Sequence, residues 1–298
     1  MPPVMLSVLV PTYNYDCTAL VKRLAKEVAE LSVAVEILVA DDCSTDNEVR
    51  QANASLDDVE GCRVFMRTQN GGRAATRNFL AQQAQYSQLL FLDADGMPTN
   101  SAFLSVYVEA VGKADVVCGS IIHPEVCPSP GKTLRYRYEK EAESRFTAER
   151  RNRRPYASFR SFNFMISQEA FVKTGFDEDF KDYGYEDLLF GSQLKEKGLS
   201  VLHIENPMLN MDIEDNDVFL QKVRESNHTL KKFYPKLREG SSLLHAYELL
   251  CRFGMKRFAA WLYKHTKKGL TANLLGVNPS LMYLKVYKLL HLAAIMAE

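Results

Sequence analysis

The sequence lacks the features that would place it among secreted disulfide-rich, zinc-binding or membrane-spanning proteins. Its six cysteines form no Cys-x-x-Cys pair and no paired spacing, so we expect reduced thiols rather than a disulfide or zinc framework. No apolar run approaches the roughly 20 residues that span a bilayer, and no basic segment followed by a long apolar stretch marks a signal peptide. These absences predict a cytoplasmic chain.

An excess of charge of either sign is also missing. The 37 basic and 37 acidic residues cancel, so the composition gives no reason to expect a nucleic-acid partner. Hydrophobic residues make up 46% of the 298 positions, which is ample for a packed core. We therefore expect a soluble globular protein whose electrostatic sites are local.

Short apolar runs alternate with stretches of helical periodicity in the first half of the chain. The expected strands lie at 6–10, 36–40, 63–66, 89–92 and 115–119, with helices over 18–31 and from about residue 73. This alternation predicts an α/β fold with a mostly parallel, Rossmann-like sheet flanked by helices. Ligands of such sheets bind at the carboxyl ends of the strands.

The alternation breaks between residues 123 and 156, where prolines precede a highly charged stretch over 135–154. Two interpretations stay open for this stretch, a solvated helix face or a mobile basic element near an anionic ligand. A strand is expected again over 161–167.

Carboxylates follow two of the expected strands. Asp93 and Asp95 come directly after 89–92, and Asp41 and Asp42 follow 36–40. Paired carboxylates at the end of a sheet suit a divalent cation that holds a phosphate. For Asp93 and Asp95, the alternative is that they only stabilise a turn. For Asp41 and Asp42, the alternative is that they cap the following helix, and for Asp46 we prefer this capping role.

Several ordered motifs together resemble the family 2 glycosyltransferases, which have the GT-A fold. The motifs lie at 10–14, 40–46, 70–78, 93–95 and 185–187. The resemblance implies an inverting, metal-dependent transfer of a sugar from a nucleoside-diphosphate donor, UDP-linked, to a saccharide or lipid-linked saccharide. It also implies a setting in bacterial surface-polysaccharide synthesis.

The resemblance assigns the donor site residue by residue. Asp42 would accept the N3 hydrogen of a uracil-type base, and Arg73 and Arg77 would reach either the diphosphate or the neighbouring acidic loop. Thr12 and Tyr13 would make chiefly backbone contacts, with buried packing an equal alternative for Tyr13. The implied donor-binding residues are Pro11, Thr12, Tyr13, Asn14, Asp41, Asp42, Gly72, Arg73, Arg77, Asp93, Ala94 and Asp95.

The implied cofactor is Mn²⁺ or Mg²⁺. Asp95 would ligate the cation directly, and Asp93 would lean toward the ribose or the water shell of the cation. Family members often carry a histidine after the last catalytic strand, but this sequence offers Asn210 there as an oxygen ligand. His203 lies upstream in an apolar strand, where it is either a satisfied core residue or a ligand.

The acceptor side is expected at residues 185–187. Asp187 is the candidate general base and Glu186 would hydrogen-bond the acceptor sugar, whereas spacing alone favours two helix N-terminal carboxylates. Asn163, Phe164 and Tyr185 are expected to form the wall of the acceptor site.

We expect a GT-A domain over 1–240, with a nucleotide-sugar half at 1–122 and an acceptor half at 123–240. Residues 241–298 carry eight basic and two acidic residues among apolar ones, which predicts an amphipathic basic helical extension. This extension either packs on the domain or contacts an anionic membrane. A catalytically silent GT-A module is the rival function, and a dinucleotide oxidoreductase is disfavoured because no Gly-x-Gly-x-x-Gly follows the first strand.

Overall fold

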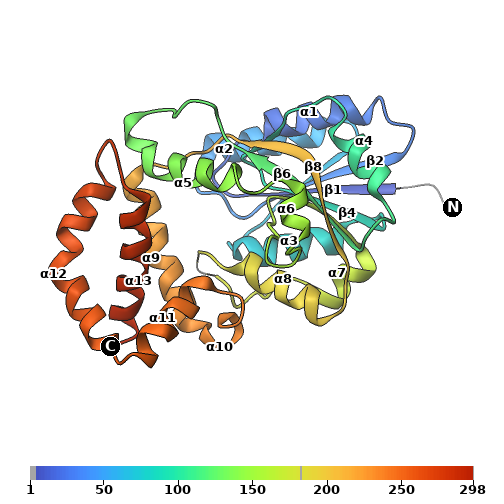
Figure 1. The fold of residues 1–298 in the computed structure, drawn as a ribbon. Helices are drawn as coiled ribbons and strands as arrows, with labels where there is room; N and C mark the ends of the chain where they lie inside the picture. Colours follow the sequence, from blue (N-terminus) through green and yellow to red (C-terminus); the bar gives the residue numbers. More distant parts are fainter. Residues whose placement is uncertain (1–4, 182, 298) are drawn as a thin grey trace. The chain divides into compact units, whose positions relative to one another are not determined.

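The computed structural model describes residues 5–181 and 183–297. Its centre is an eight-stranded sheet with the strand order β3-β2-β1-β4-β7-β6-β8-β5 (Figure 1). The strands are β1 Met5–Thr12, β2 Ala34–Asp41, β3 Cys62–Met66, β4 Gln88–Leu92, β5 Gly96–Pro98, β6 Val116–Ile122, β7 Asn163–Ser167 and β8 Val201–Asn210. Each strand expected from the sequence is present, with ends shifted by a few residues.

One half of the sheet is parallel, as expected. β1 pairs in parallel with β2 and β4, and β2 with β3. Side chains alternate between two cores, because Leu6 and Val8 belong to one buried cluster and Leu9 to the other. Burial on both faces explains why these strands read as continuous apolar runs.

The other half of the sheet is mixed. β7 runs antiparallel to both β4 and β6, whereas β6 and β8 are parallel and β8 pairs antiparallel with β5. The expectation of a mostly parallel sheet thus holds for β3-β2-β1-β4. The mixed part follows from long-range pairings that a local apolar pattern does not encode.

Helices cover both faces of the sheet (Figure 1). α1 and α4 contribute to one core cluster, and α3, α7 and the later part of α8 to the other. The helices are α1 Thr18–Val28, α2 Asn47–Ala54, α3 Gly72–Gln83, α4 Phe103–Ala110, α5 Thr133–Glu143, α6 Ala148–Asn152, α7 Gln168–Thr174, α8 Glu186–Glu196, α9 Asn216–Lys232, α10 Tyr234–Leu237, α11 Ser242–Arg252, α12 Lys256–Leu274 and α13 Leu281–Ile295, with 3-10 turns at Ser55–Asp58 and Pro130–Lys132.

The chain divides into two compact units. The first comprises residues 1–122, 146–181 and 190–212 and contains the whole sheet, and the second comprises 123–145, 182–189 and 213–298. The segment after residue 240 is helical, in α11, α12 and α13. Whether residue 240 is a functional domain boundary stays a prediction.

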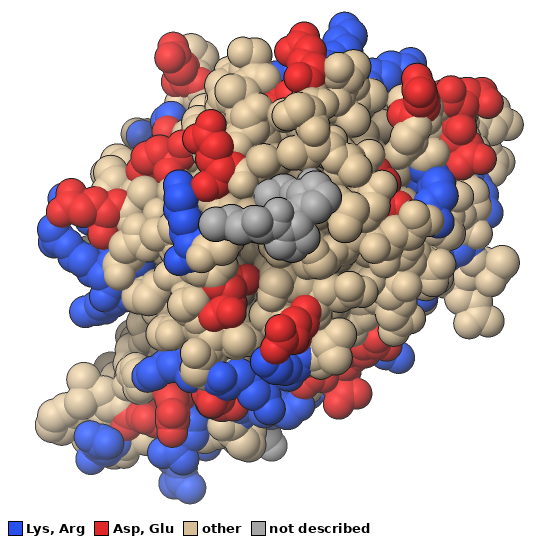
Figure 2. Space-filling model, turned by 90° about the vertical axis from the view of Figure 1, so that its right-hand side faces the viewer, with Lys and Arg blue, Asp and Glu red and all other residues tan. Residues whose placement is uncertain are grey.

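Acidic and basic side chains are interspersed on the face drawn in Figure 2. Within 5–181 and 183–297, none of the helices combines the length and apolarity needed to cross a membrane.

Candidate functional site

The loops that follow β1 and β2 are joined through Asn14. The Oδ1 atom of Asn14 accepts hydrogen bonds from the backbone N–H groups of Thr45, at 2.8 Å, and Asp46, at 3.1 Å. The Asn14 backbone N–H donates to the hydroxyl of Ser44 at 2.8 Å. Asn14 adopts a φ of 49°, which asparagine tolerates better than most residues. The two loops therefore form one fixed rim, from which the side chain of Tyr13 remains 47% exposed.

The acidic residues after β2 have separate structural roles. Asp46 is the N-cap of α2, because its carboxylate accepts from the N–H groups of Glu48 and Val49, which confirms the preferred capping role. Asp41 is fully buried and accepts from the N–H of Ser44 at 2.7 Å. Its other oxygen, Oδ2, has no hydrogen-bond partner among the described residues.

Asp42 organises the glycine loop before α3. Its carboxylate accepts from the N–H groups of Gly71, at 3.0 Å, and Gly72, at 2.8 Å, and from the guanidinium of Arg67. Gly72 has a φ of 82°, a left-handed conformation that favours glycine. Arg67 also donates to the hydroxyl of Thr76 at 2.8 Å. Sequence reasoning missed Arg67, because a single arginine after a strand carries no recognisable pattern.

Arg77 holds the acidic loop after β4. Its side chain is 2% exposed, and its Nη2 atom donates to Asp93 Oδ1 at 2.5 Å. The guanidinium lies 5.2 Å from the ring centroid of Phe176, while its Nε and Nη1 atoms have no partner among the described residues. Of the two targets expected for Arg77, the structure selects the acidic loop. Arg73, one helical turn earlier, is exposed.

Asp95 lies in a field of negative charge. Burial, followed by the charge of Asp93, raises the pKa of Asp95 to about 7, and Asp212 acts in the same direction. The nearby Arg73 opposes the rise. The carboxylate pair thus carries charge that the protein compensates only in part, which favours a bound cation at this point.

The segment after β8 closes the site from the other side. Asn210 lies opposite Gly96 in the β5–β8 register, and the Met211 N–H donates to the carbonyl of Asp95 at 2.8 Å. The side chain of Asn210 accepts from the N–H of Asp212 at 3.0 Å. Sequence reasoning missed Asp212, because only the β5–β8 pairing brings it near Asp95.

The oxygens here are of the kind that Mg²⁺ and Mn²⁺ prefer. In the part of the chain that the structure describes, however, no three His, Cys, Asp or Glu side chains are grouped as metal ligands. A cation at Asp95 would therefore need oxygen ligands in addition to the acidic side chains.

Glu186 and Asp187 form the first turn of α8, in the second unit. The chain reaches them through Gly184, with a φ of 99°, and Tyr185, with a φ of 69°. A bulky residue in the left-handed region is strained, and such strain persists where the surroundings fix it, often at functional sites.

Asn163 and Phe164 require a correction. Both were expected in an acceptor wall, but Asn163 is 1% exposed and Phe164 is fully buried. The amide of Asn163 donates to the carbonyls of Ser120 and Asn206, and the ring of Phe164 stacks on Phe91 at 4.9 Å between centroids. Both side chains therefore belong to the core and have no surface to offer a ligand.

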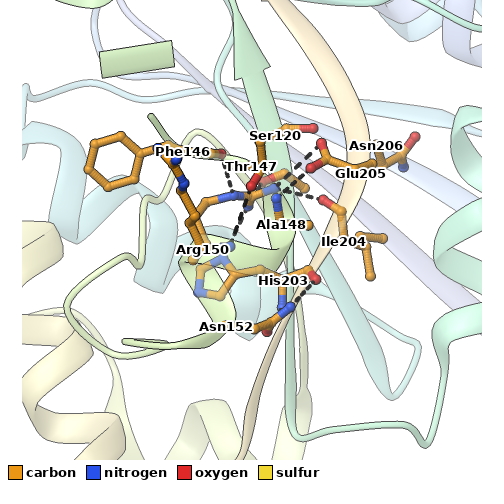
Figure 3. A network of polar contacts seen from close by, with 12 residues as sticks. Ser120, Phe146, Thr147, Ala148, Arg150, Asn152, His203, Ile204, Glu205 and Asn206 are labelled. Atoms are coloured by element: carbon orange, nitrogen blue, oxygen red, sulfur yellow. Dashed lines mark hydrogen bonds and ion pairs between the residues drawn. The ribbon is translucent and has the colours of Figure 1, made fainter. Parts of the chain in front are cut away.

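His203 is a satisfied core residue, in a polar network between α6 and β8 (Figure 3). Its Nε2 atom lies 2.9 Å from the carbonyl of Pro155, so Nε2 carries the proton and Nδ1 accepts from Arg151 at 3.1 Å. Burial lowers the pKa of His203 to about 4, with Arg151 acting in the same direction. A neutral imidazole is what this network requires.

Arg151 itself is buried and donates to the carbonyls of Gly119, at 2.7 Å, Phe146, at 3.1 Å, and Ile204, at 2.8 Å. The two interpretations of the charged stretch 135–154 were a solvated helix face and a mobile basic element. Neither applies to Arg151, because its side chain is buried and hydrogen-bonded. It is a structural arginine that fastens α6 to the sheet.

Known proteins resemble the chain over different lengths. The family described as glycosyl transferase family 2 matches residues 7–175. An uncharacterized glycosyltransferase of Haemophilus influenzae is 29% identical over 96 residues, which are 32% of this chain and 38% of that protein. The Staphylococcus aureus poly(ribitol-phosphate) β-N-acetylglucosaminyltransferase TarS is 34% identical over 91 residues, 30% of this chain and 16% of TarS. The matched segments thus span well under half of these relatives.

Two solved structures share the fold over nearly the whole chain. A mannosyltransferase of Pyrobaculum calidifontis, in complex with GDP-Man and Mn²⁺, superposes with a TM-score of 0.56 and 16% identity, covering 98% of this chain and 86% of that one. Residues 1–349 of TarS in complex with UDP-GlcNAc give a TM-score of 0.52 and 17% identity, covering 99% and 93%. The expected GT-A fold is confirmed. Because the family match covers more than half of the sequence, the chain belongs to glycosyl transferase family 2.

Proposed function

We propose that this protein transfers a sugar from a UDP-linked donor to a hydroxyl of a saccharide or lipid-linked saccharide, in bacterial surface-polysaccharide synthesis. The observation that carries the proposal is the convergence of three loops of the first unit. The glycine loop held by Asp42, the loop of Asp93 and Asp95, and the segment 210–212 meet at the carboxyl ends of strands. The complexes of TarS with UDP-GlcNAc and of the mannosyltransferase with GDP-Man support a nucleotide-sugar donor.

A divalent cation fits the residues present. The partly compensated charge around Asp95, its raised pKa and an all-oxygen donor set suit Mn²⁺ or Mg²⁺. Asp95 would hold the cation, supported by Asp93, with Asn210 and Asp212 as further oxygens nearby. When bound, the cation would offset the charge that develops on the departing nucleoside diphosphate.

The chain's own residues would position the donor. Asp42 and Arg67 fix the glycine loop, and Arg77 fixes Asp93, so neither carboxylate has to reorganise when donor binds. Arg73, exposed and close to Asp95, would meet the diphosphate. Tyr13 would flank the nucleotide. Contact between Asp42 and a uracil N3 hydrogen remains a prediction.

Transfer would proceed by one displacement with inversion. The acceptor oxygen attacks the anomeric carbon as the bond from that carbon to the diphosphate oxygen breaks. Asp187 would take the proton of the acceptor hydroxyl, and Glu186 and Tyr185 would bind the acceptor sugar.

A donor screen that measures release of nucleoside diphosphate, with and without Mn²⁺, tests the proposal. We expect release from a UDP-sugar that requires the cation and falls at least about a hundredfold in Asp95→Asn. Asp58→Asn, which removes an exposed carboxylate from the 3-10 turn Ser55–Asp58, is the control with unchanged activity. If no donor releases nucleotide with any saccharide acceptor, the catalytically silent module becomes the better description.

We also propose peripheral contact with an anionic membrane through residues 241–298. Leu249, Phe253, Phe258 and Trp261 are exposed around the end of α11 and the start of α12, and the rings of Phe258 and Trp261 stack at 5.7 Å. Residues 253–297 contain seven lysines and arginines and no aspartate or glutamate. Exposed aromatic side chains beside uncompensated cations favour the interface of an anionic bilayer.

A further inference from the structure

A hollow lies in the second unit among α9, α12 and α13, and none of the residues that line it is assigned to sugar transfer. Its volume is about 470 Å³. Three cationic side chains and three hydroxyl groups line it, and no carboxylate does: Arg224, Lys267, Lys268, Tyr263, Thr271 and Tyr287. The lining is therefore rich in hydrogen-bond donors and positive charge.

The floor of the hollow is fixed by packing. Tyr287 is 1% exposed, and its hydroxyl oxygen accepts from Arg224 Nε at 2.8 Å and from the Tyr263 hydroxyl at 3.4 Å. The two tyrosine rings meet edge to face at 5.7 Å, and the ring of His291 stacks on Tyr287 at 5.9 Å. This arrangement holds the guanidinium in place before any ligand arrives.

The cations at the hollow are not neutralised. Across the described residues, no ion pair involves Arg224, Lys267 or Lys268, and of their side-chain nitrogens only Nε of Arg224 donates a hydrogen bond, to the Tyr287 hydroxyl. The helices α12 and α13 contain no acidic residue, and neither Asp217 nor Glu225 of α9 lines the hollow. Three uncompensated cations around one concave site attract an anion.

The hydrogen-bond donors around the hollow indicate which class of anion it would bind. A guanidinium offers a planar pair of N–H groups, and two ammonium groups offer compact charge, which together match the several oxygens of a phosphate. We propose that this hollow binds the phosphate group of an anionic ligand, either a soluble phosphate monoester or the headgroup of a phospholipid. The site is independent of the proposed sugar transfer.

The first arm of the test uses soluble probes. Titration calorimetry of the full chain with inorganic phosphate and with glycerol 3-phosphate, against chloride at equal ionic strength, measures the affinity directly. We expect Lys267→Gln/Lys268→Gln to bind at least about tenfold more weakly, as expected for lost charge-assisted hydrogen bonds. Both lysines are exposed, so this variant keeps the fold, whereas Arg224→Gln also removes a contact to Tyr287.

The second arm uses phosphatidylcholine vesicles that contain phosphatidic acid, with phosphatidylserine vesicles as the comparison. Sedimentation that favours phosphatidic acid and falls in Lys267→Gln/Lys268→Gln identifies a lipid headgroup. Binding in the soluble arm alone identifies a soluble phosphate ligand.

Lys264→Gln is the matched control, because Lys264 is exposed on the same helix and does not line the hollow. We expect it to retain the phosphate affinity of the parent and the preference for phosphatidic acid. The proposal is overturned if neither arm detects phosphate binding, or if Lys264→Gln loses as much affinity as the variant of the hollow.

Discussion

The arginine side chains near the candidate site differ in what they contact within the protein. From the sequence, Arg67, Arg73 and Arg77 are equivalent as cations. In the structure, Arg77 pairs with Asp93 and Arg67 pairs with Asp42. Arg73 is exposed, and under the proposed function it would meet the diphosphate. Removing Arg77 would leave Asp93 unpaired in a partly buried site, which is costly.

Asp187→Asn is expected to lower kcat by about a hundredfold or more, because general-base catalysis contributes on that scale. The donor KM should stay within about twofold of the parent, since the amide keeps the shape of the side chain. Initial-rate kinetics with saturating acceptor measure both constants. Asp179→Asn, which changes an exposed carboxylate eight residues earlier in the chain, is the control. An unchanged kcat in Asp187→Asn would remove this residue from the mechanism.

Because the pKa of His203 is lowered on folding, we expect the free energy of unfolding to decrease in acid. Its folded pKa of about 4 lies below the value near 6.5 of an exposed imidazole, so the stabilisation is complete above pH 6.5 and is lost as the pH falls toward 4. Between pH 7 and pH 5 the loss amounts to about 2 kcal/mol. Urea unfolding at the two pH values measures it.

His203→Gln should reduce this pH dependence by the share that His203 contributes, because its amide accepts from Arg151 without titrating; the buried His291, whose pKa is also lowered to about 4, keeps its own share. His245→Gln, at an exposed position of α11, should keep the dependence of the parent. Equal slopes in the parent and His203→Gln would show that another group dominates.

At the scale of elements, the loops between strands and helices form a site only when particular contacts fix their positions. The Asp42 carboxylate fixes the glycine loop to β2, and Arg151 fixes α6 to β8. Each contact joins segments that are far apart in sequence. Its loss should therefore destabilise the whole helix or loop that it holds in place.

Gly72→Ala and Gly112→Ala form a matched pair, because both glycines have a φ near 80° and open space where a Cβ would stand. Each substitution should cost about 1 kcal/mol of folding stability. Only Gly72→Ala should also raise the donor KM, roughly tenfold, through a displaced loop. Thermal unfolding and donor kinetics separate the two effects. Equal donor KM values in the two variants would argue against a role for the glycine loop.

Arg151→Met should destabilise the first unit by about 3 kcal/mol or more, because the buried carbonyl of Gly119 and the partly buried carbonyls of Phe146 and Ile204 lose their donor. Arg150→Met, at the exposed neighbouring position, should stay within about 0.5 kcal/mol of the parent. Urea unfolding compares the two. Similar losses in both variants would mean that α6 is held by other contacts.

At the scale of the whole molecule, a chain without net charge still concentrates its cations locally. Eight of its basic residues and only two acidic ones lie after residue 240. Helix formation there leaves Phe258 and Trp261 52% and 53% exposed. Composition alone gives no hint of this segregation, which emerges only along the sequence.

Phe258→Ser/Trp261→Ser should reduce sedimentation with anionic vesicles at least about tenfold, because two aromatic rings no longer enter the interface. Raised salt should weaken binding of the parent, since the cations act through a screened field. Phe146→Ser, at an exposed aromatic position of the first unit, is the control. If the parent fails to sediment at any salt concentration, residues 241–298 are packing helices only.

Sequence alone determined most of the strands, the loops at their carboxyl ends and the family, because each is encoded in residues close together along the chain, whereas the short strand β5 was not expected. The tertiary structure decided which side chains remain available at those loops. Pairing of β5 with β8 brought Asp212 to Asp95, and burial made Asn163 and Phe164 core residues. These outcomes depend on contacts between distant segments, whose geometry is set by packing of the whole sheet rather than by any local pattern.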